Sequence, residues 1–125
     1  MKNSLIEINE LIGVWGSLLC NNQAEIISSV PPADINKAAL ENITRHCVEL
    51  LSTSSLSMQG LMEAVIHFQQ RKIFILDLEQ AILIVLCTPS IDISLLRMTI
   101  NLITSRWQTD SKIQKQLKAN FVERL

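Results

Sequence analysis

The chain is poor in glycine and in aromatic residues. Among its 125 residues there are three glycines, none adjacent to another, and aromatic residues make up 4% with no tyrosine. Loops that cradle phosphates and the fingerprint of dinucleotide-binding sites both need clustered glycines, because their backbone must approach the phosphates closely. We therefore expect that the chain neither binds nor hydrolyses GTP by itself.

Cysteine and histidine are also scarce. Cys20, Cys47 and Cys87 lie within or at the end of apolar segments and have no Cys-x-x-Cys spacing. This pattern favours buried free thiols over a disulfide or a metal site. His46 and His67 stand apart from any second ligand at metal-binding spacing, so no metal and no cofactor is predicted.

No hydrophobic run is long enough to cross a membrane. The longest, from Ala81 to Cys87, is far short of the ~20 residues of a spanning helix. The N-terminus carries Glu7 and Glu10 where a signal peptide would have its apolar core. A net charge of -1 provides no concentrated basic face for nucleic acid. We expect a cytoplasmic protein with no transmembrane segment and no nucleic-acid partner.

Aliphatic residues, in contrast, are abundant. Hydrophobic residues make up 48% of the chain and its mean hydropathy is +0.27, which is apolar for one soluble domain of this length. A small domain cannot hide all of this apolar surface in its own core. The composition therefore predicts self-association.

The first half of the chain predicts a helix, a hairpin and a longer helix. Ser4 is a plausible N-cap for the first helix, which Gly13 ends. The following strand, 14–20, is apolar on both faces apart from Ser17, which is typical of an interior strand. Asn21 and Asn22 suit a tight turn, because asparagine tolerates a left-handed backbone.

Pro31 and Pro32 stop the second strand, and Asp34 then caps a long helix from Ile35 to about Ser52. Helical spacing predicts a broad inner face made of Ile35, Ala39, Ile43, Cys47, Leu50 and Leu51. On the opposite side a heptad-like seam is formed by Ala38, Glu41, Arg45, Val48 and Ser52. From spacing alone, an ordinary solvated face is the favoured interpretation of these residues.

The second half predicts three strands at 61–68, 72–78 and 81–87, and the aliphatic third strand should lie at the centre of the sheet. A last helix follows from Ile93 to Trp107, capped by Asp92 or Ser94. Its inner stripe consists of Leu96, Ile100 and Ile103.

The order of these elements is specific. The stretch from Ile12 to Ser29 reads as a strand, a polar turn within Cys20–Ala24 and a second strand, and it lies between a short and a longer helix. This order resembles the opening of the roadblock or dynein light-chain domain. Ile93-Ser94-Leu95-Leu96-Arg97 is similar to the Leu-Gly-Leu-x-Arg opening of the last helix in that family. The turn after Cys20 departs from the family, which usually has an acidic residue and a glycine there.

The resemblance covers roughly residues 3 to 107. It implies a roadblock-like domain over residues 1–108 and a C-terminal amphipathic helical extension over 109–125. The implied fold is α+β: a five-stranded antiparallel sheet sandwiched between one long helix and two other helices, a roadblock or profilin-like arrangement.

The resemblance also implies a non-catalytic function. Members of the family are dimerisation platforms, often partners of Ras-like GTPases. For this chain it implies a homodimer whose sheets join at the third strand and whose long helices pair, as a regulator or adaptor of a small Ras-like GTPase. The dimer and partner surface would then be the seam at Ala38, Glu41, Arg45, Val48 and Ser52. Two alternatives stay open: a scaffold subunit of a motor or membrane-associated complex with no GTPase partner, and a small-molecule sensor.

Few residues have a spacing that suits catalysis. Asp77 and Glu79 would lie about 7 Å apart on one strand face, but solvation at a strand end explains them as well. No serine lies in a Gly-x-Ser-x-Gly elbow. An arginine finger would have to reach a GTPase, whereas Arg97 and Arg106 belong to the helix expected on the opposite sheet face from the partner surface. We expect no enzyme.

The C-terminal extension has its own apolar stripe and its own charge. The stripe consists of Ile113, Leu117, Phe121 and Leu125, and from Arg106 onward five basic residues accompany two acidic ones. A helix of about 15 residues is marginal in isolation, so it must dock on something. We expect an accessory contact to the dimer or its GTPase; docking on its own domain, on an anionic membrane, or no docking at all are the alternatives.

Overall fold

The computed structural model describes residues 1–54, 63–68, 70–78 and 80–120. Within them the elements follow in the order α1 (Lys2–Asn9), β1 (Val14–Cys20), β2 (Ile26–Val30), α2 (Lys37–Ser54), β3 (Glu63–Phe68), β4 (Arg71–Asp77), β5 (Ile82–Cys87), α3 (Ile93–Trp107) and α4 (Ser111–Asn120).

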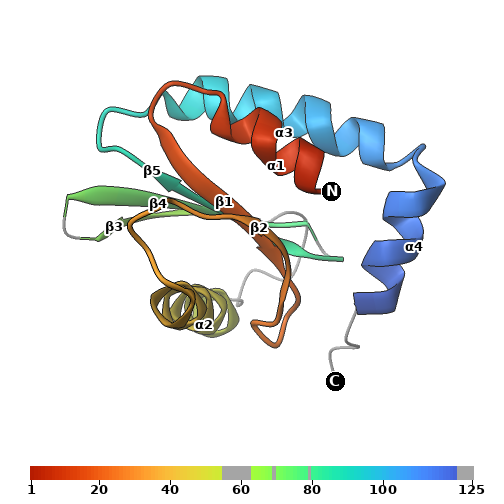
Figure 1. Cartoon of the computed structure of the whole chain (residues 1–125), viewed down its shortest axis with the longest axis horizontal. Coiled ribbons are helices and arrows are strands. Elements are labelled where there is room, and N and C mark those ends of the chain that lie inside the picture. Colours follow the sequence, from red (N-terminus) through yellow and green to blue (C-terminus); the bar gives the residue numbers. More distant parts are fainter. Residues whose placement is uncertain (55–62, 69, 79, 121–125) are drawn as a thin grey trace.

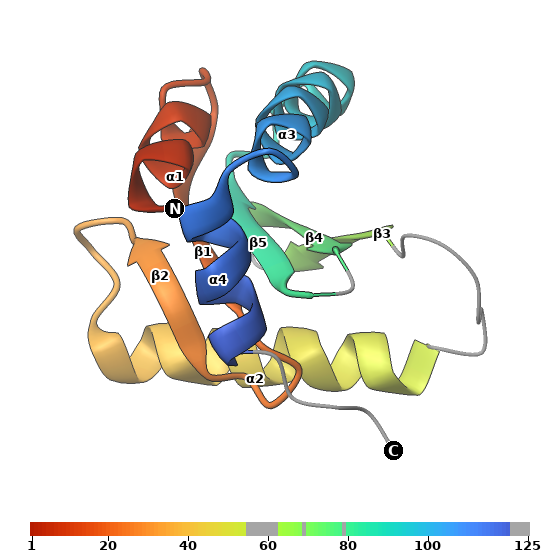
Figure 2. The same cartoon turned by 90° about the vertical axis from the view of Figure 1, so that its right-hand side faces the viewer.

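The five strands form one antiparallel sheet in the order β2-β1-β5-β4-β3. The long helix α2 covers one face, and α1 and α3 lie side by side on the other (Figure 1, Figure 2). The predicted α+β sandwich is confirmed, with the aliphatic strand β5 at the centre as expected. None of the described helices is long and apolar enough to cross a membrane.

A separate apolar core fills each side of the sheet. Between the sheet and α1 and α3, the core includes Leu19, Phe74 and Val85 together with the predicted inner stripe of α3. Between the sheet and α2, Leu18 and Ile84 lie among the buried residues. Strands that bury both faces need apolar residues at every position, which explains why β5 shows no polar alternation.

Two predicted helix caps are wrong. α1 begins before Ser4, whose hydroxyl instead accepts a hydrogen bond from Trp107 Nε1 at 3.0 Å. α2 begins after Asn36, whose Oδ1 accepts a hydrogen bond from the Ala39 N–H at 2.8 Å. Asn36 therefore takes the capping role predicted for Asp34. The cap of α3 agrees with the prediction, since the carboxylate of Asp92 accepts from the Leu95 N–H.

The hairpin between β1 and β2 also differs from the prediction. The left-handed backbone falls at Ala24, with φ 63°, and not at Asn21 or Asn22. Asn21 is buried, and its Oδ1 accepts hydrogen bonds from the backbone N–H groups of Gln23 and Glu25. The Asn21 side chain bonds to the backbone within the turn, and the positive φ occurs at Ala24 and not at an asparagine.

The buried face of α2 is rotated relative to the prediction. Its fully covered residues are Leu40, Thr44, Cys47, Val48 and Leu51, with Thr44 0% exposed. Ala39 is exposed and Leu50 is 38% exposed, although both were expected to face the sheet. Thr44 can be buried because its hydroxyl donates to the Leu40 carbonyl at 2.8 Å, which satisfies the polar group within the helix.

Helix α4 packs against the domain that precedes it. Leu117 is 3% exposed and belongs to the core beneath α3, with Ile113 packed against that core. Gln114 Nε2 also donates to the Trp107 carbonyl at 2.8 Å. The described part of the extension therefore docks on its own domain, one of the alternatives considered for it.

Candidate binding surfaces on the long helix

Helix α2 lies across the strands, from beneath β2 to beneath β3, and reaches beyond both edges of the sheet (Figure 2). Its 18 residues make a helix about 27 Å long, whereas five strands spaced about 4.8 Å apart span only about 19 Å. A cleft lies along each flank of the helix. One of them, the β3-side cleft, opens toward β3 and β4, and the other, the turn-side cleft, opens toward β2 and the β1–β2 turn.

The β3-side cleft is the more apolar of the two. It has a volume of about 350 Å³ and is lined by Asn42, Ile43, His46, Cys47, Leu50, Ile66 and Ile73. It borders β3, an edge strand whose only strand neighbour among the described residues is β4. Ile43 and Leu50 bring partly exposed apolar side chains to this surface. An apolar cleft beside an open strand edge is suited to association with another protein.

The polar side chains of this cleft include His46 and Cys47 of α2. His46 Nδ1 lies 2.8 Å from the Asn42 carbonyl one turn earlier, so this nitrogen acts as the donor. Burial raises the pKa of the Cys47 thiol to about 12. A thiol with such a pKa is protonated near neutral pH and is a poor nucleophile. The prediction of buried free thiols is confirmed for all three cysteines.

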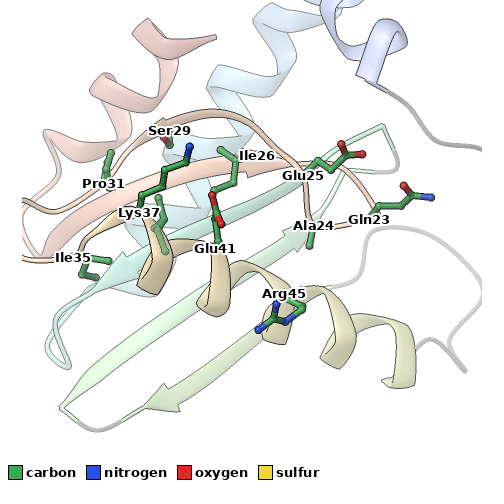
Figure 3. A pocket seen from close by; sticks show the side chains of 11 residues that line it. Gln23, Ala24, Glu25, Ile26, Ser29, Pro31, Ile35, Lys37, Glu41 and Arg45 are labelled. Atoms are coloured by element: carbon green, nitrogen blue, oxygen red, sulfur yellow. The ribbon is translucent and has the colours of Figure 1, made fainter.

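The turn-side cleft is larger and mixed in character. It has a volume of about 730 Å³ and is lined by Gln23, Ala24, Glu25, Ile26, Ser29, Pro31, Ile35, Lys37, Leu40, Glu41 and Arg45. Figure 3 shows Lys37 and Glu41 pointing from α2 toward β2, while Arg45 lies farther along the helix. Arg45 donates to the Asn42 side chain at 2.5 Å. In the described part of the chain, Lys37 and Glu41 have no ion pair.

The structure separates the residues of the predicted seam. Ala38, Glu41, Arg45 and Ser52 are exposed, but Val48 is 7% exposed and packs into the core beneath α2. The assignment of Val48 to the outward surface is therefore corrected. Glu41 and Arg45 line the turn-side cleft and not the β3-side cleft. Sequence reasoning missed the β3-side set, although Ala39, Ile43, His46 and Leu50 also recur at helical spacing.

Those residues considered for catalysis that the structure describes lie apart from both clefts. Arg97 and Arg106, on α3, form ion pairs with Glu63 (2.8 Å) and Glu7 (2.5 Å) on the opposite face of the sheet from α2. Asp77 ends β4, and Glu79 lies outside the described residues. Among the described residues no group of three or more His, Cys, Asp or Glu side chains is placed to hold a metal ion.

The structure describes only two of the four residues predicted for an accessory contact, and both pack against the domain's own core. Leu117 is buried in the domain's own core, so it is not available as an anchor on a partner, and Ile113 packs beside it. Phe121 and Leu125 lie outside the described residues. The outward face of α4 instead carries the exposed lysines Lys112, Lys115 and Lys118.

Comparison with solved structures finds proteins that share the fold of this chain at low sequence identity. A Roadblock/LC7 domain from Streptomyces avermitilis matches with a TM-score of 0.72 and 9% identity, over 86% of this chain and 94% of that one. The gliding protein MglB from Thermus thermophilus matches with a TM-score of 0.66 and 9% identity, over 94% and 87%. A structure of MglB with a tetrameric arrangement matches with a TM-score of 0.67 and 9% identity, over 94% of this chain and 88% of that one.

No family model and no curated protein matches the sequence. At identities this low, the likeness to solved structures concerns the fold. The resemblance predicted from the hairpin and the opening of the last helix is confirmed at that level: this chain has the fold of the Roadblock/LC7 domains.

Proposed function

We propose that this chain is a non-catalytic, homodimeric binding platform of the roadblock type that regulates or tethers a small Ras-like GTPase. The observation that carries the proposal is the apolar β3-side cleft of about 350 Å³ beside the open edge of β3. A second copy of the chain would pair its β3 with this edge and cover the cleft with its own α2. The 48% content of hydrophobic residues supports such burial.

The proposed contact uses a different face of α2 from the seam predicted by spacing. It consists of Ala39, Ile43, His46 and Leu50 on α2, with Ala64 and Ile66 on β3. Since α2 reaches beyond the edge of β3, the C-terminal half of the helix would lie beneath the partner's sheet as well (Figure 2). Both the strand edge and the apolar flank of the helix would be covered by one association.

The oligomeric state tests this proposal. Light scattering of the full chain at micromolar concentration should give about twice 14.1 kDa. Leu50→Asp should shift the chain toward monomer, because a charge would be buried without a partner in the interface. Leu102→Asp is the matched control, since Leu102 is 66% exposed on α3 on the other side of the sheet. A monomeric unsubstituted chain, or equal effects of the two variants, would contradict the proposed dimer.

The GTPase partner is tested separately. The proposal of a Ras-like GTPase is supported by the roadblock fold. The chain should retain Ras-like GTPases from its own source in a pull-down with nucleotide-locked forms, and should show no GTP turnover alone. If it is dimeric but binds none of them in either nucleotide state, the scaffold alternative is favoured.

A further inference from the structure

The edge strand β2 is open to a further strand. Its only strand neighbour among the described residues is β1, so one row of its backbone N–H and C=O groups has no strand partner. At the end of the strand the Val30 carbonyl accepts a hydrogen bond from Asn9 Nδ2 at 3.1 Å. The row from Ile26 to Ser29 is thus the part available for pairing. Such a row is complementary to another extended backbone.

This edge has no charged residue to oppose pairing. Strand edges are commonly defended by charged residues, yet Ile26–Val30 contains none. All five of its residues are partly exposed. A register irregularity lies within the strand, because Leu19 pairs with Ser28 whereas Cys20 pairs with Ile26, and Pro31 and Pro32 follow the strand. These features limit pairing to a short segment, which suits a peptide better than a whole sheet.

The turn-side cleft lies between this edge and the first half of α2 (Figure 3). A strand added next to β2 would point every second side chain at this cleft. There it would meet the apolar side chains of Ile26, Ile35 and Leu40, with Lys37 and Glu41 beside them. The edge supplies main-chain hydrogen bonds and the cleft supplies a place for alternate side chains, the two requirements of recognition by strand addition.

We propose that β2 and the turn-side cleft bind an extended segment of a protein partner, which adds a strand to the sheet and places an apolar side chain flanked by charged ones over the cleft. A second copy of the chain is a less suitable occupant. If two copies pair through β3, pairing through β2 as well would produce an open chain of subunits that does not close. This choice of occupant rests on the proposed dimer, whereas strand addition itself does not.

The test begins with linear random peptides displayed on phage and selected on the full-length chain. Selected peptides are synthesised, and their binding is mapped by backbone amide shifts of the isotope-labelled protein. We expect shifts at residues 26–30 and at the cleft-lining residues of α2. Methylation of the peptide nitrogens should weaken binding about tenfold at alternate positions and little at the positions between, because only every second N–H faces β2.

Charge variants provide a second measurement on the same peptides. Glu41→Lys should change their affinity about threefold or more, with the sign set by the peptide charge that faces the cleft. Glu49→Lys is the matched control, an identical change at an exposed position of α2 that lines neither cleft. The proposal is overturned if no peptide is selected, if shifts fall on β3, or if methylation shows no alternation. Light scattering of the same samples reports the dimer independently, so failure of one proposal is distinguishable from failure of the other.

Discussion

Gly16 lies at a point in β1 where a side chain would meet Pro32. A Cβ atom placed there would lie 2.5 Å from Cδ and 2.8 Å from N of Pro32. The backbone nitrogen of a proline cannot rotate away as the end of a flexible side chain could. The close approach of β1 to the buried Pro32 is thus possible only because residue 16 is glycine.

Gly16→Ala should therefore destabilise the fold. Relieving the contact requires a shift of backbone, and overpacking of this kind costs about 1–3 kcal/mol. Urea unfolding followed by circular dichroism measures the change in the free energy of unfolding. Ser105→Ala, an exposed change on α3, is the control and should have little effect. Ala38→Gly is unsuitable as a control because glycine weakens a helix. Equal stability of Gly16→Ala and the parent would contradict the close approach.

The three buried thiols predict a loss of stability at alkaline pH. Burial raises the pKa of Cys20, Cys47 and Cys87 from 9.0 to about 12, with Lys72 opposing the shift at Cys87. Because these pKa values are higher in the folded state, the unfolded chain releases its protons first as the pH rises. The contribution to stability is complete below pH 9.0 and declines as the pH approaches 12.

Unfolding free energies measured across this pH range check the prediction. Cys47→Ala should show a smaller alkaline decline than the parent chain, although its stability at neutral pH is lower because of the lost packing. A decline of the same size in both proteins would show that the Cys47 thiol does not contribute to it.

At the scale of the element, the start of α2 depends on Asn36. The sequence predicts Asp34 as the cap of α2, whereas the path of the chain places Asn36 in that role. The carboxylate of Asp34 accepts a hydrogen bond from Arg71 at 2.6 Å, and the Arg71 guanidinium also lies 4.3 Å from the centre of the Trp15 ring. Asp34 is thus used in a contact between distant segments, and Asn36 caps the helix.

Substitution of each residue by alanine separates the two roles. Asn36→Ala should cost about 1 kcal/mol, the usual cost of losing an N-cap. Asp34→Ala should cost less, because exposed ion pairs contribute about 0–1 kcal/mol and are weakened by salt. Thermal unfolding at low and high salt compares the variants. A larger, salt-independent loss for Asp34→Ala would restore it as the cap.

For the whole molecule, the structure places α4 in the fold. Leu117 contributes to the core shared with Trp107, and Gln114 is hydrogen-bonded to the Trp107 backbone. The boundary predicted at residue 108 therefore passes through a packed contact. Removal of residues 109–125 would uncover part of this core, so we expect a less stable domain and not only a weaker partner contact.

Leu117→Ala tests this arrangement without truncation. Loss of a buried leucine side chain costs about 2–5 kcal/mol, a large part of the stability of a small domain. Lys115→Ala, on the exposed side of the same helix, is the matched control and should have little effect. If both variants unfold at the same temperature as the parent, α4 does not stabilise the domain.

The sequence by itself determined the elements and the layers. Period-2 and helical spacing, proline and glycine positions and the uninterrupted aliphatic strand identified β1, the central β5 and α3, and their order identified the fold. These features are local or depend on order along the chain. An apolar pattern indicates which side of an element is buried. Only a few arrangements of a five-stranded sheet and its helices bury all of these sides at once.

The tertiary structure alone decided which way α2 is turned and where α4 docks. Spacing favoured Ala39 and Leu50 as inner residues and Val48 as an outer one, yet the sheet covers Thr44 and Val48 instead. Several apolar stripes on this helix have similar widths, and a threonine that bonds its own helix costs little to bury. The rotation that fits the surface of the sheet is selected by packing against residues distant in sequence, which no local pattern contains.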